Sequence, residues 1–302
     1  MAQRSSIYFC GTPEFAVPSL QALINDPHFS VDFAITQPDK PVGRKKSITP
    51  SPIKLAAQQN NIPIFQPKNI NKEFFPHFSH SNVRPDFLVV VAYGQILSQE
   101  ILDLPSVMSV NIHASLLPRW RGASPIQHAI LSGDLSTGIT IQKMVHSLDA
   151  GPILAQEETS ITSKETLLTL HDRLAHMGAR LLIDTLKHPH HPELQDEAKA
   201  LYCSKLTRAD GKVDPLTMDA TMIDRHIRAL NPWPGVHCLI AEQTLKILQS
   251  SLVPTPDSFP LPCAHQSTLH LNMVQMPGKK PVSGAAWARG SKPCSSSPGM
   301  PR

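Results

Sequence analysis

Phe87-Leu88-Val89-Val90-Val91-Ala92 is a nearly unbroken run of apolar residues, rich in valine. Such a run is typical of a strand in the middle of a parallel sheet, where helices cover both faces and every side chain is buried. A second apolar stretch, residues 108–112, follows it along the chain. The two stretches predict successive strands of one sheet.

The chain before this run alternates between strand-like and helix-like segments. Predicted strands cover residues 7–9, 31–35 and 62–65, and predicted helices cover 15–24, 53–59 and, more weakly, 72–78. This alternation indicates an α/β domain with a doubly wound, mostly parallel sheet. A long amphipathic helix over residues 163–186, with Ser163 as its N-cap, is expected to close the domain.

Length and composition limit the class of protein. The chain has 302 residues, enough for two domains, and is 41% hydrophobic and 17% charged, as in soluble globular proteins. No apolar run approaches the ~18 residues of a membrane span, and the first residues lack the apolar core of a signal peptide. We therefore expect a cytoplasmic protein without membrane association.

The cysteines favour the same compartment. The chain has five, an odd number, widely scattered and without a Cys-x-x-Cys pair. This pattern argues against both a zinc site and a disulfide framework and fits a reducing cytoplasm. No metal is expected.

Charge is unevenly distributed along the chain. Residues 207–302 contain 10 Lys and Arg against 6 Asp and Glu, so they carry the whole net charge of +4. A basic module after a neutral one suggests a polyanionic partner such as a nucleic acid. The excess is modest and many ordinary domains reach it, so charge alone leaves the partner open.

Asn111 and His113 stand at the end of the strand predicted around residues 108–112. Successive side chains of a strand point to opposite faces, so these two project to the same side. Polar side chains at the carboxyl end of a strand are placed to meet a ligand. Taken alone, the pair could equally be a capping asparagine and a structural histidine.

A later segment brings a carboxylate. Residues 138–144 have the β-branched alternation of a strand and lead to Asp149, which precedes an Ala-Gly-Pro turn. An aspartate in that position usually bonds nearby backbone N–H groups, so Asp149 alone favours a structural role.

Together these residues form a more specific set: Asn111-x-His113, then Ser115-Leu116-Leu117-Pro118-x-x-x-Gly122, then Leu148-Asp149-x-Gly151. The set resembles the folate-dependent formyltransferases. The resemblance covers residues from about 7 to 247 and includes FCGTPEF at 9–15, TQPDKP at 36–41, VVVAYG at 89–94 and LNPWPG at 230–235. It is therefore close, and it spans most of the chain.

Within that family the resemblance is to members that transfer a formyl group from 10-formyltetrahydrofolate to the α-amino group of methionyl-initiator tRNA for translation initiation. It implies that Asn111 donates its amide N–H to the oxyanion of a tetrahedral transition state and that His113 stabilises or protonates it. Asp149 would orient His113 and help to remove the proton of the attacking amine. The partner would be charged initiator tRNA.

The resemblance also implies ligand contacts. Ser115, Leu116, Leu117 and Pro118 would border the folate, and its pterin pocket would be lined by Phe87, Val91, Tyr93, Ile96 and Leu97. Phe15 would help to shape a pocket for the formyl-accepting methionine.

The loop over residues 37–50 carries Lys40, Arg44, Lys45 and Lys46. It could simply be a solvated loop tip. In the family, members that act on tRNA have a basic insertion here that approaches the acceptor end, and members that act on small substrates lack it. The loop is therefore expected to contact phosphates of the tRNA.

Four parts are predicted: a catalytic domain over residues 1–187, a linker over 188–206, an OB-like β-barrel over 207–290 that contacts tRNA, and a disordered tail over 291–302. Histidines 188, 190 and 191 lie among prolines and indicate a solvated linker. Pro254, Pro256, Pro260 and Pro262 crowd a segment where barrel strands are expected. The barrel is therefore predicted to be incomplete.

Alternative functions remain open. The same chemistry could serve a sugar nucleotide, glycinamide ribonucleotide or another small amine, or water in a formyl-folate hydrolase. A non-catalytic RNA-binding protein is a third class. A dinucleotide site is not expected, because Gly11 alone does not make a G-x-G-x-x-G motif. We expect a monomer.

Overall fold

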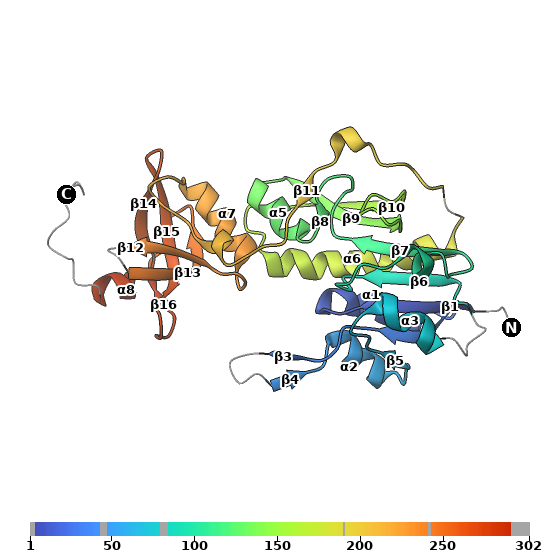
Figure 1. Ribbon diagram of the computed structural model, residues 1–302. Coiled ribbons are helices and arrows are strands. Elements are labelled where there is room, and N and C mark those ends of the chain that lie inside the picture. Colours follow the sequence, from blue (N-terminus) through green and yellow to red (C-terminus); the bar gives the residue numbers. More distant parts are fainter. Residues whose placement is uncertain (1–3, 43–46, 79–83, 190, 241–242, 291–302) are drawn as a thin grey trace. The chain divides into compact units, whose positions relative to one another are not determined.

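The computed structural model describes residues 4–42, 47–78, 84–189, 191–240 and 243–290. Within them the chain forms two compact units (Figure 1). The first takes in residues 1–125, 136–160 and 168–203, and the second takes in 126–135, 161–167 and 204–302. Two short pieces that precede residue 187 thus belong to the second unit, and most of the predicted linker belongs to the first.

Unit 1 is built on a seven-stranded sheet in the order β10-β9-β7-β6-β1-β2-β5. Strands β5, β2, β1, β6 and β7 run parallel, whereas β9 and β10 are antiparallel to their neighbours. The predicted mostly parallel sheet is confirmed. The strands are β1 (Ser5–Gly11), β2 (Phe29–Ile35), β5 (Ile64–Phe65), β6 (Phe87–Val91), β7 (Met108–His113), β9 (Ser136–Lys143) and β10 (Ile153–Ser160).

Helices connect the strands. They are α1 (Val17–Asn25), preceded by the 3-10 turn η1 (Glu14–Ala16), α2 (Pro52–Gln59), α3 (Ile70–Phe78), α4 (Gln99–Leu102) and the long α6 (Leu167–Lys187). Ser51 caps α2 by accepting a hydrogen bond from the Lys54 amide, 3.1 Å away. Helix α6 begins at Leu167, later than the predicted start at Ser163. The residues before it form a turn closed by the Glu165 amide on the Thr162 carbonyl.

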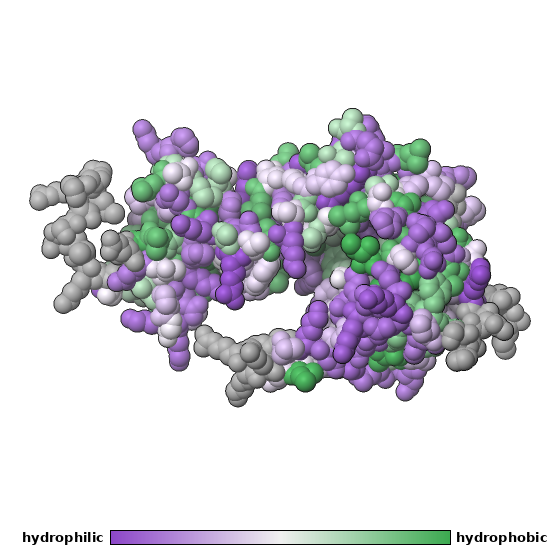
Figure 2. Space-filling view, in the orientation of Figure 1, coloured by the Kyte–Doolittle hydropathy of each residue, from purple (hydrophilic) through white to green (hydrophobic). Residues whose placement is uncertain are grey.

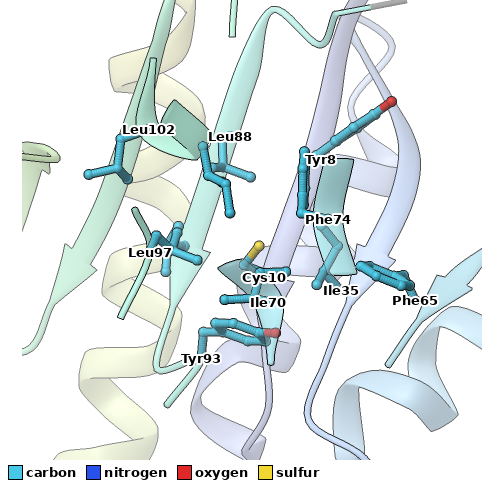
Figure 3. Packing of buried hydrophobic residues seen from close by; sticks show 12 residues of the cluster. Tyr8, Cys10, Ile35, Phe65, Ile70, Phe74, Leu88, Tyr93, Leu97 and Leu102 are labelled. Atoms are coloured by element: carbon cyan, nitrogen blue, oxygen red, sulfur yellow. The ribbon is translucent and has the colours of Figure 1, made fainter. Parts of the chain in front are cut away.

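One face of the sheet carries a buried apolar cluster (Figure 3). Tyr8 and Cys10 of β1 and Leu88 of β6 lie in it together with Ile70 and Phe74 of α3. These strand residues alternate with others that face the opposite side, so β6 is buried throughout, as its unbroken apolar run predicts. This buried cluster stabilises the sheet, and strand β7 of the same sheet carries the polar residues Asn111 and His113.

Two small ladders flank the main sheet. Strands β3 (Lys40–Val42) and β4 (Ser47–Thr49) form an antiparallel hairpin, and β8 (Arg121–Gly122) pairs in parallel with β11 (Tyr202–Cys203). The hairpin is anchored by Asp39, which accepts hydrogen bonds from Gln66 Nε2 at 2.8 Å and Lys54 Nζ at 2.6 Å. These bonds hold the pKa of the Asp39 carboxyl below its ordinary value.

Unit 2 is rich in strands. Its sheet has the order β12-β13-β15-β14, with β16 paired to β15. The elements are α5 (Pro125–Ser132), η3 (Ala209–Gly211), α7 (Ala220–Leu230), β12 (Val236–Ile240), β13 (Gln243–Ser251), β14 (Phe259–Cys263), β15 (Ser267–Gln275), β16 (Val282–Ser283) and α8 (Gly284–Gly290). A β-rich second unit is thus confirmed, and no pairing between the described parts of β12 and β14 closes the sheet into a barrel.

The prolines that suggested a missing strand lie inside β14. Pro260 and Pro262 are two residues apart, so their missing N–H groups point to the same side of the strand. Strand β14 pairs only with β15 and forms an edge of the described sheet. Proline is tolerated in an edge strand when its nitrogen faces away from the ladder.

Asp26, just after α1, ties this helix to the end of α6. Its carboxylate accepts hydrogen bonds from the Lys187 ammonium and from His28. Burial raises the pKa of Asp26, but the bonds from Lys187 and His28 outweigh burial and lower it from 3.8 to about 2.

This ion pair predicts a pH-dependent stability. A lowered folded-state pKa stabilises fully above the unfolded value, and the stabilisation is lost as pH falls through the folded value. Asp26→Asn should therefore lower Tm near neutral pH by about 2–4 °C, whereas the two proteins should converge as the pH approaches 2. Thermal melts across this range check it, with the exposed Asp172→Asn as control. A difference that persists at the lowest pH would contradict the assignment.

No helix in the described ranges is both long and apolar enough to cross a membrane. The visible surface is largely hydrophilic, with apolar side chains in small groups (Figure 2). Among the exposed large apolar residues are Ile48 of the hairpin and Ile96 after β6.

Candidate active site

Strand β7 carries the two polar residues predicted from the sequence. Asn111 and His113 point to one face, and Ile112 between them points to the other, where Gly178 of α6 lies close enough that a Cβ would approach Ile112 to 2.9 Å. The glycine lets α6 pack tightly against β7. Helix α6 therefore covers the face opposite Asn111 and His113.

Both ring nitrogens of His113 have neighbours in the protein. Nε2 lies 2.8 Å from the Trp120 carbonyl oxygen, and Nδ1 lies 3.7 Å from Asp149 Oδ1. A carbonyl oxygen can only accept, so Nε2 carries a hydrogen and donates it. Nδ1, which faces Asp149, is then the ring atom that can gain or lose a proton. The ring is buried, at 6% exposure.

Asp149 lies in the loop after β9 and returns over the sheet face that carries Asn111 and His113. Its Oδ1 accepts a hydrogen bond from Gln142 Nε2 at 3.1 Å, and its Oδ2 accepts one from the Gly122 amide at 2.9 Å. Gln142 is the direct partner of Asn111 across the β7–β9 ladder. The backbone of Asp149 has φ 49°, a left-handed conformation that is unusual for a residue with a side chain.

Asn111 is less enclosed than its neighbours. It is half-buried in β7, and the structure records no hydrogen bond from its side-chain amide to any described residue. Its N–H donors are thus available to a ligand next to His113. The structure brings the three predicted catalytic residues together on one sheet face.

The segment that follows β7 is held against the sheet. Ser115 Oγ donates to the Arg119 carbonyl at 2.6 Å, and the Leu117 amide donates to Thr140 Oγ1 at 3.0 Å. Ser115 and Leu117 are buried, while Leu116 and Pro118 are partly exposed. Of the four residues predicted to border the folate, Leu116 and Pro118 thus offer side-chain surface.

The residues predicted to line a pterin pocket divide in the same way. Phe87, Val91, Tyr93 and Leu97 are buried, and Ile96 is 74% exposed. Tyr93 and Leu97 belong to the apolar cluster on one face of the sheet (Figure 3). Of the five, Ile96 is the one whose side chain is accessible in this conformation.

Two buried polar atoms near the carboxyl ends of β2 and β6 lack partners among the described residues: Gln37 Nε2 and Tyr93 Oη. A Cβ on Gly94 would lie 4.0 Å from Gln37 Nε2, so this donor faces the turn after β6. Burial also raises the pKa of the Tyr93 hydroxyl. Unsatisfied buried donors are rare in proteins, and a bound ligand is one explanation.

The predicted acceptor-side residues are more dispersed. Phe15 in η1 is buried with its ring 5.3 Å from the ring of His171 in α6. Lys40 is exposed at the start of the β3–β4 hairpin. Arg44, Lys45 and Lys46 lie outside the described residues.

No role was predicted from the sequence for Gln142, Arg121 or Gln195. All three are buried, and the last lies in the segment predicted as a linker. Gln142 could have been found from the sequence, because it is a polar residue inside the strand-like run 138–144. No local signal marked Gln195, because its partners are more than 40 residues away. In the described ranges, no group of three or more His, Cys, Asp or Glu could hold a metal ion.

The chain is similar to known proteins over most of its length. Residues 4–186 match the formyl transferase family and residues 205–292 match the formyl transferase C-terminal domain. A methionyl-tRNA formyltransferase from Pseudomonas syringae pv. syringae is 39% identical over 298 residues, which cover 94% of this chain and 94% of that protein. Another, from Pseudomonas savastanoi pv. phaseolicola, is 40% identical over 300 residues with the same coverage.

The chain belongs to the methionyl-tRNA formyltransferase family.

Solved structures share the fold of this formyltransferase at lower identity. The sugar 3N-formyl transferase WlaRD, in the presence of dTDP and 5-N-formyl-THF, is 20% identical, has a TM-score of 0.66 and matches over 92% of this chain and 100% of its own. An N-formyltransferase from Helicobacter canadensis is 18% identical, with a TM-score of 0.66 over 89% of this chain and 99% of its own. HypX from Aquifex aeolicus, in complex with tetrahydrofolic acid, is 12% identical, with a TM-score of 0.60 over 94% of this chain and 46% of its own.

Proposed function

We propose that this formyltransferase moves a formyl group from 10-formyltetrahydrofolate to the α-amino group of methionyl-initiator tRNA. The acceptor follows from the relatives that are 39–40% identical over 94% of both chains and are named for methionyl-tRNA. The donor follows from two relatives in fold whose structures contain a folate. The observation that carries the chemistry is the shared sheet face of Asn111 and His113, with the Asp149 carboxylate 3.7 Å from the histidine.

The residues present fit a folate at this place. The Asn111 amide is available, Gln37 Nε2 is buried without a partner among the described residues, and Ile96 exposes an apolar side chain. A pterin ring offers hydrogen-bonding edges and flat apolar faces, which suits such a set. Leu116 and Pro118 complete the proposed lining. When bound, the formyl-folate supplies an electrophilic formyl carbon.

Asn111 acts on the oxygen of that formyl group. Attack by an amine forms a C–N bond and leaves the negative charge on this oxygen. The Asn111 amide N–H donates to it, and a single donor of this kind is typically worth ~3–4 kcal/mol in the transition state. Loss of the folate nitrogen then restores the C=O bond. The amine itself is the nucleophile, so no covalent intermediate with the protein is required.

His113 and Asp149 handle the protons. Because Nε2 is committed to the Trp120 carbonyl, His113 gives or takes a proton through Nδ1. That atom faces Asp149 Oδ1, which accepts the proton lost by the attacking nitrogen, directly or through a water. A proton held at His113 Nδ1 can stabilise the oxyanion or pass to the departing nitrogen.

The acceptor is tested by competition between substrate classes. With 10-formyltetrahydrofolate as donor, charged initiator tRNA should be formylated with a kcat/KM far above that for an amino-sugar nucleotide or glycinamide ribonucleotide. The sugar-transferase relatives in fold make the sugar nucleotide the informative competitor. Preference for it would overturn the proposed acceptor and leave the formyl-transfer chemistry intact. Binding of tRNA without any formylation would favour the RNA-binding alternative.

The basic loop gives a prediction for tRNA recognition. Arg44→Ala should raise the KM for charged tRNA by about 10-fold with little change in folate affinity, because a phosphate contact is lost and no catalytic group is touched. The effect should shrink with rising salt, which already screens that contact. Kinetics at two salt concentrations check it, with Lys72→Ala on α3 as a control cation. Equal losses for tRNA and folate would show a folding defect instead.

Other features remain proposals. The assignment of catalysis to residues 1–187 and of tRNA binding to residues 207–290 is one, as are the tail over 291–302, which lies outside the described residues, the monomeric state and the cytoplasmic location. The basic excess of residues 207–302 supports tRNA contact by the second unit.

A further inference from the structure

Residues 193–203, here called the return segment, follow α6 and run back along unit 1. Glu193 and Ile153 exchange two backbone hydrogen bonds, of 2.9 and 2.8 Å. The segment then includes the 3-10 turn η2 (Glu197–Lys199) and ends in β11, which pairs with β8. It is thus tied to unit 1 at both ends.

Gln195 faces inward in this segment, at 9% exposure. Its Nε2 donates to the Asp149 carbonyl at 2.8 Å and to the Gly151 carbonyl at 2.7 Å. An amide NH₂ group has two hydrogens, and these two carbonyls use both of them. Gln195 therefore clamps the backbone on both sides of Ala150, where Asp149 adopts its left-handed conformation.

The orientation of the Gln195 amide is set by Arg121. Arg121 Nε donates to Gln195 Oε1 at 2.9 Å, and a guanidinium has no acceptor. The oxygen of Gln195 must therefore face Arg121, which leaves the NH₂ group facing the Asp149 loop. If the amide were flipped, the Gln195 NH₂ group would face the Arg121 Nε donor, and the Gln195 oxygen would face the carbonyl oxygens of Asp149 and Gly151.

Arg121 is itself fixed by the return segment. The side chain is 1% exposed, and its two Nη atoms form a fork on Glu197, at 2.9 and 2.7 Å. Nη1 also lies 3.2 Å from Tyr202 Oη. These bonds raise the pKa of the guanidinium, since Glu197 stabilises its charge more than burial opposes it. A buried charge with a bidentate partner has little freedom to move.

The same two-residue strand that carries Arg121 also contacts the carboxylate of Asp149. Gly122 follows Arg121 in β8, and its amide donates to Asp149 Oδ2 at 2.9 Å. Gly122 has φ 118°, and a Cβ there would lie 2.3 Å from the Cys203 carbonyl of β11. The pairing of β8 with β11 therefore locates the donor that holds one carboxylate oxygen, while Gln195 holds the backbone of the same residue.

From these contacts we infer that Gln195, oriented by Arg121, is a positioning residue for Asp149. It does not touch the reacting atoms, and it acts by fixing the loop that places the Asp149 carboxylate 3.7 Å from His113. Displacement of a catalytic group by about 1 Å can cost on the order of 10²-fold in rate. This inference rests on the catalytic role proposed for Asp149.

Gln195→Glu is the sharpest substitution. The new side chain has nearly the same shape, and one of its oxygens still accepts from Arg121, with an opposite charge in addition. The other oxygen would face the carbonyls of Asp149 and Gly151, so both clamping bonds become repulsive. In the full-length protein, kcat should fall roughly 10- to 100-fold, with the KM values for formyl-folate and charged tRNA changed by less than about 3-fold. Glu193→Gln, an exposed change in the same segment, should leave both unchanged.

A double-mutant cycle separates positioning from general stability. In an Asp149→Asn background there is no carboxylate to place, so Gln195→Glu should change kcat by less than about 2-fold. A loss of equal size in both backgrounds, or a wild-type kcat for Gln195→Glu, would overturn the inference. If Asp149→Asn itself retained the wild-type kcat, the role proposed for Asp149 would fail, and this outcome is distinguishable from the other two.

A second variant covers the case in which Gln195→Glu does not fold. Glu197 is 69% exposed, so Glu197→Gln removes the charge that pairs with Arg121 but leaves an amide oxygen to accept from the guanidinium. It should lower kcat about 3- to 10-fold, a smaller loss because Gln195 remains, and this loss should also vanish in the Asp149→Asn background. An equal loss in both backgrounds would contradict the positioning role here too.

Discussion

Replacing Asp149 with asparagine is expected to lower kcat by about 10²- to 10⁴-fold. The carboxylate faces His113 Nδ1 at 3.7 Å and, in the proposed mechanism, accepts the proton that leaves the attacking amine. Asparagine keeps the shape but cannot take that proton. The fold should tolerate the change, because the amide oxygen of the new side chain can still accept from the Gly122 amide.

The matched control is Asp172→Asn, the same change at a side chain that is 76% exposed on α6. Rapid-mixing kinetics at saturating substrates would give the rate of formyl transfer, and equilibrium binding would give the folate Kd. The rate should fall with the Kd nearly unchanged. A wild-type rate, or a Tm drop large enough to account for the loss, would show that Asp149 is a turn residue, the alternative that its position before a Gly-Pro turn suggested.

Replacing Asn111 is expected to have the next largest effect. Asn111→Ala removes the only proposed amide donor to the oxyanion and should lower kcat by about 10²- to 10³-fold. Asn111→Asp keeps the shape of the side chain and places acceptor oxygens where the donor stood, so its loss should be at least as large. The side chain makes no recorded hydrogen bond to the described residues, so neither change should lower Tm by more than about 2 °C.

The contrast between the two variants tests the mechanism of Asn111. Steady-state kinetics with both substrates varied would separate kcat from KM. If Asn111→Asp were as active as the wild type, the oxyanion role would be wrong, because a carboxylate cannot donate at neutral pH. If only the KM for folate rose, Asn111 would be a binding residue.

The sheet of unit 1 could be predicted because its strands carry local patterns. The valine-rich run at 87–91 is buried throughout, as are Ser109, Val110 and Ile112 before His113. The two stretches appear in the structure as adjacent parallel strands. Period-two alternation also placed Asn111 and His113 on one face correctly. Neither β3–β4 nor β10 was predicted. Strand β10 alternates partly exposed and exposed residues, so its pattern lacks the apolar signal of a core strand.

The surroundings of the site depend on contacts between distant residues. Arg121 and Glu197 are separated by 76 residues, and Gln195 and Asp149 by 46. A proline-broken polar stretch after a long helix favours a linker on composition alone. The pairing of β8 with β11 and the bonds of Gln195 to Asp149 and Gly151 show instead that part of it packs against the site. The prolines of β14 led to a wrong prediction of a missing strand. The strand is present, and its place at the edge of the sheet accommodates them.

In the proposed reaction, the formyl group passes directly to the amine of charged initiator tRNA at the Asn111–His113–Asp149 face. The most direct measurement follows an isotope from 10-[¹³C]formyltetrahydrofolate by mass spectrometry of both the protein and the methionine released from the tRNA. We expect ¹³C-formyl on the methionine nitrogen, none bound to the protein, and loss of the product with Asp149→Asn. Absence of labelled formylmethionine with the intact enzyme, or a formylated protein side chain as an intermediate, would contradict it.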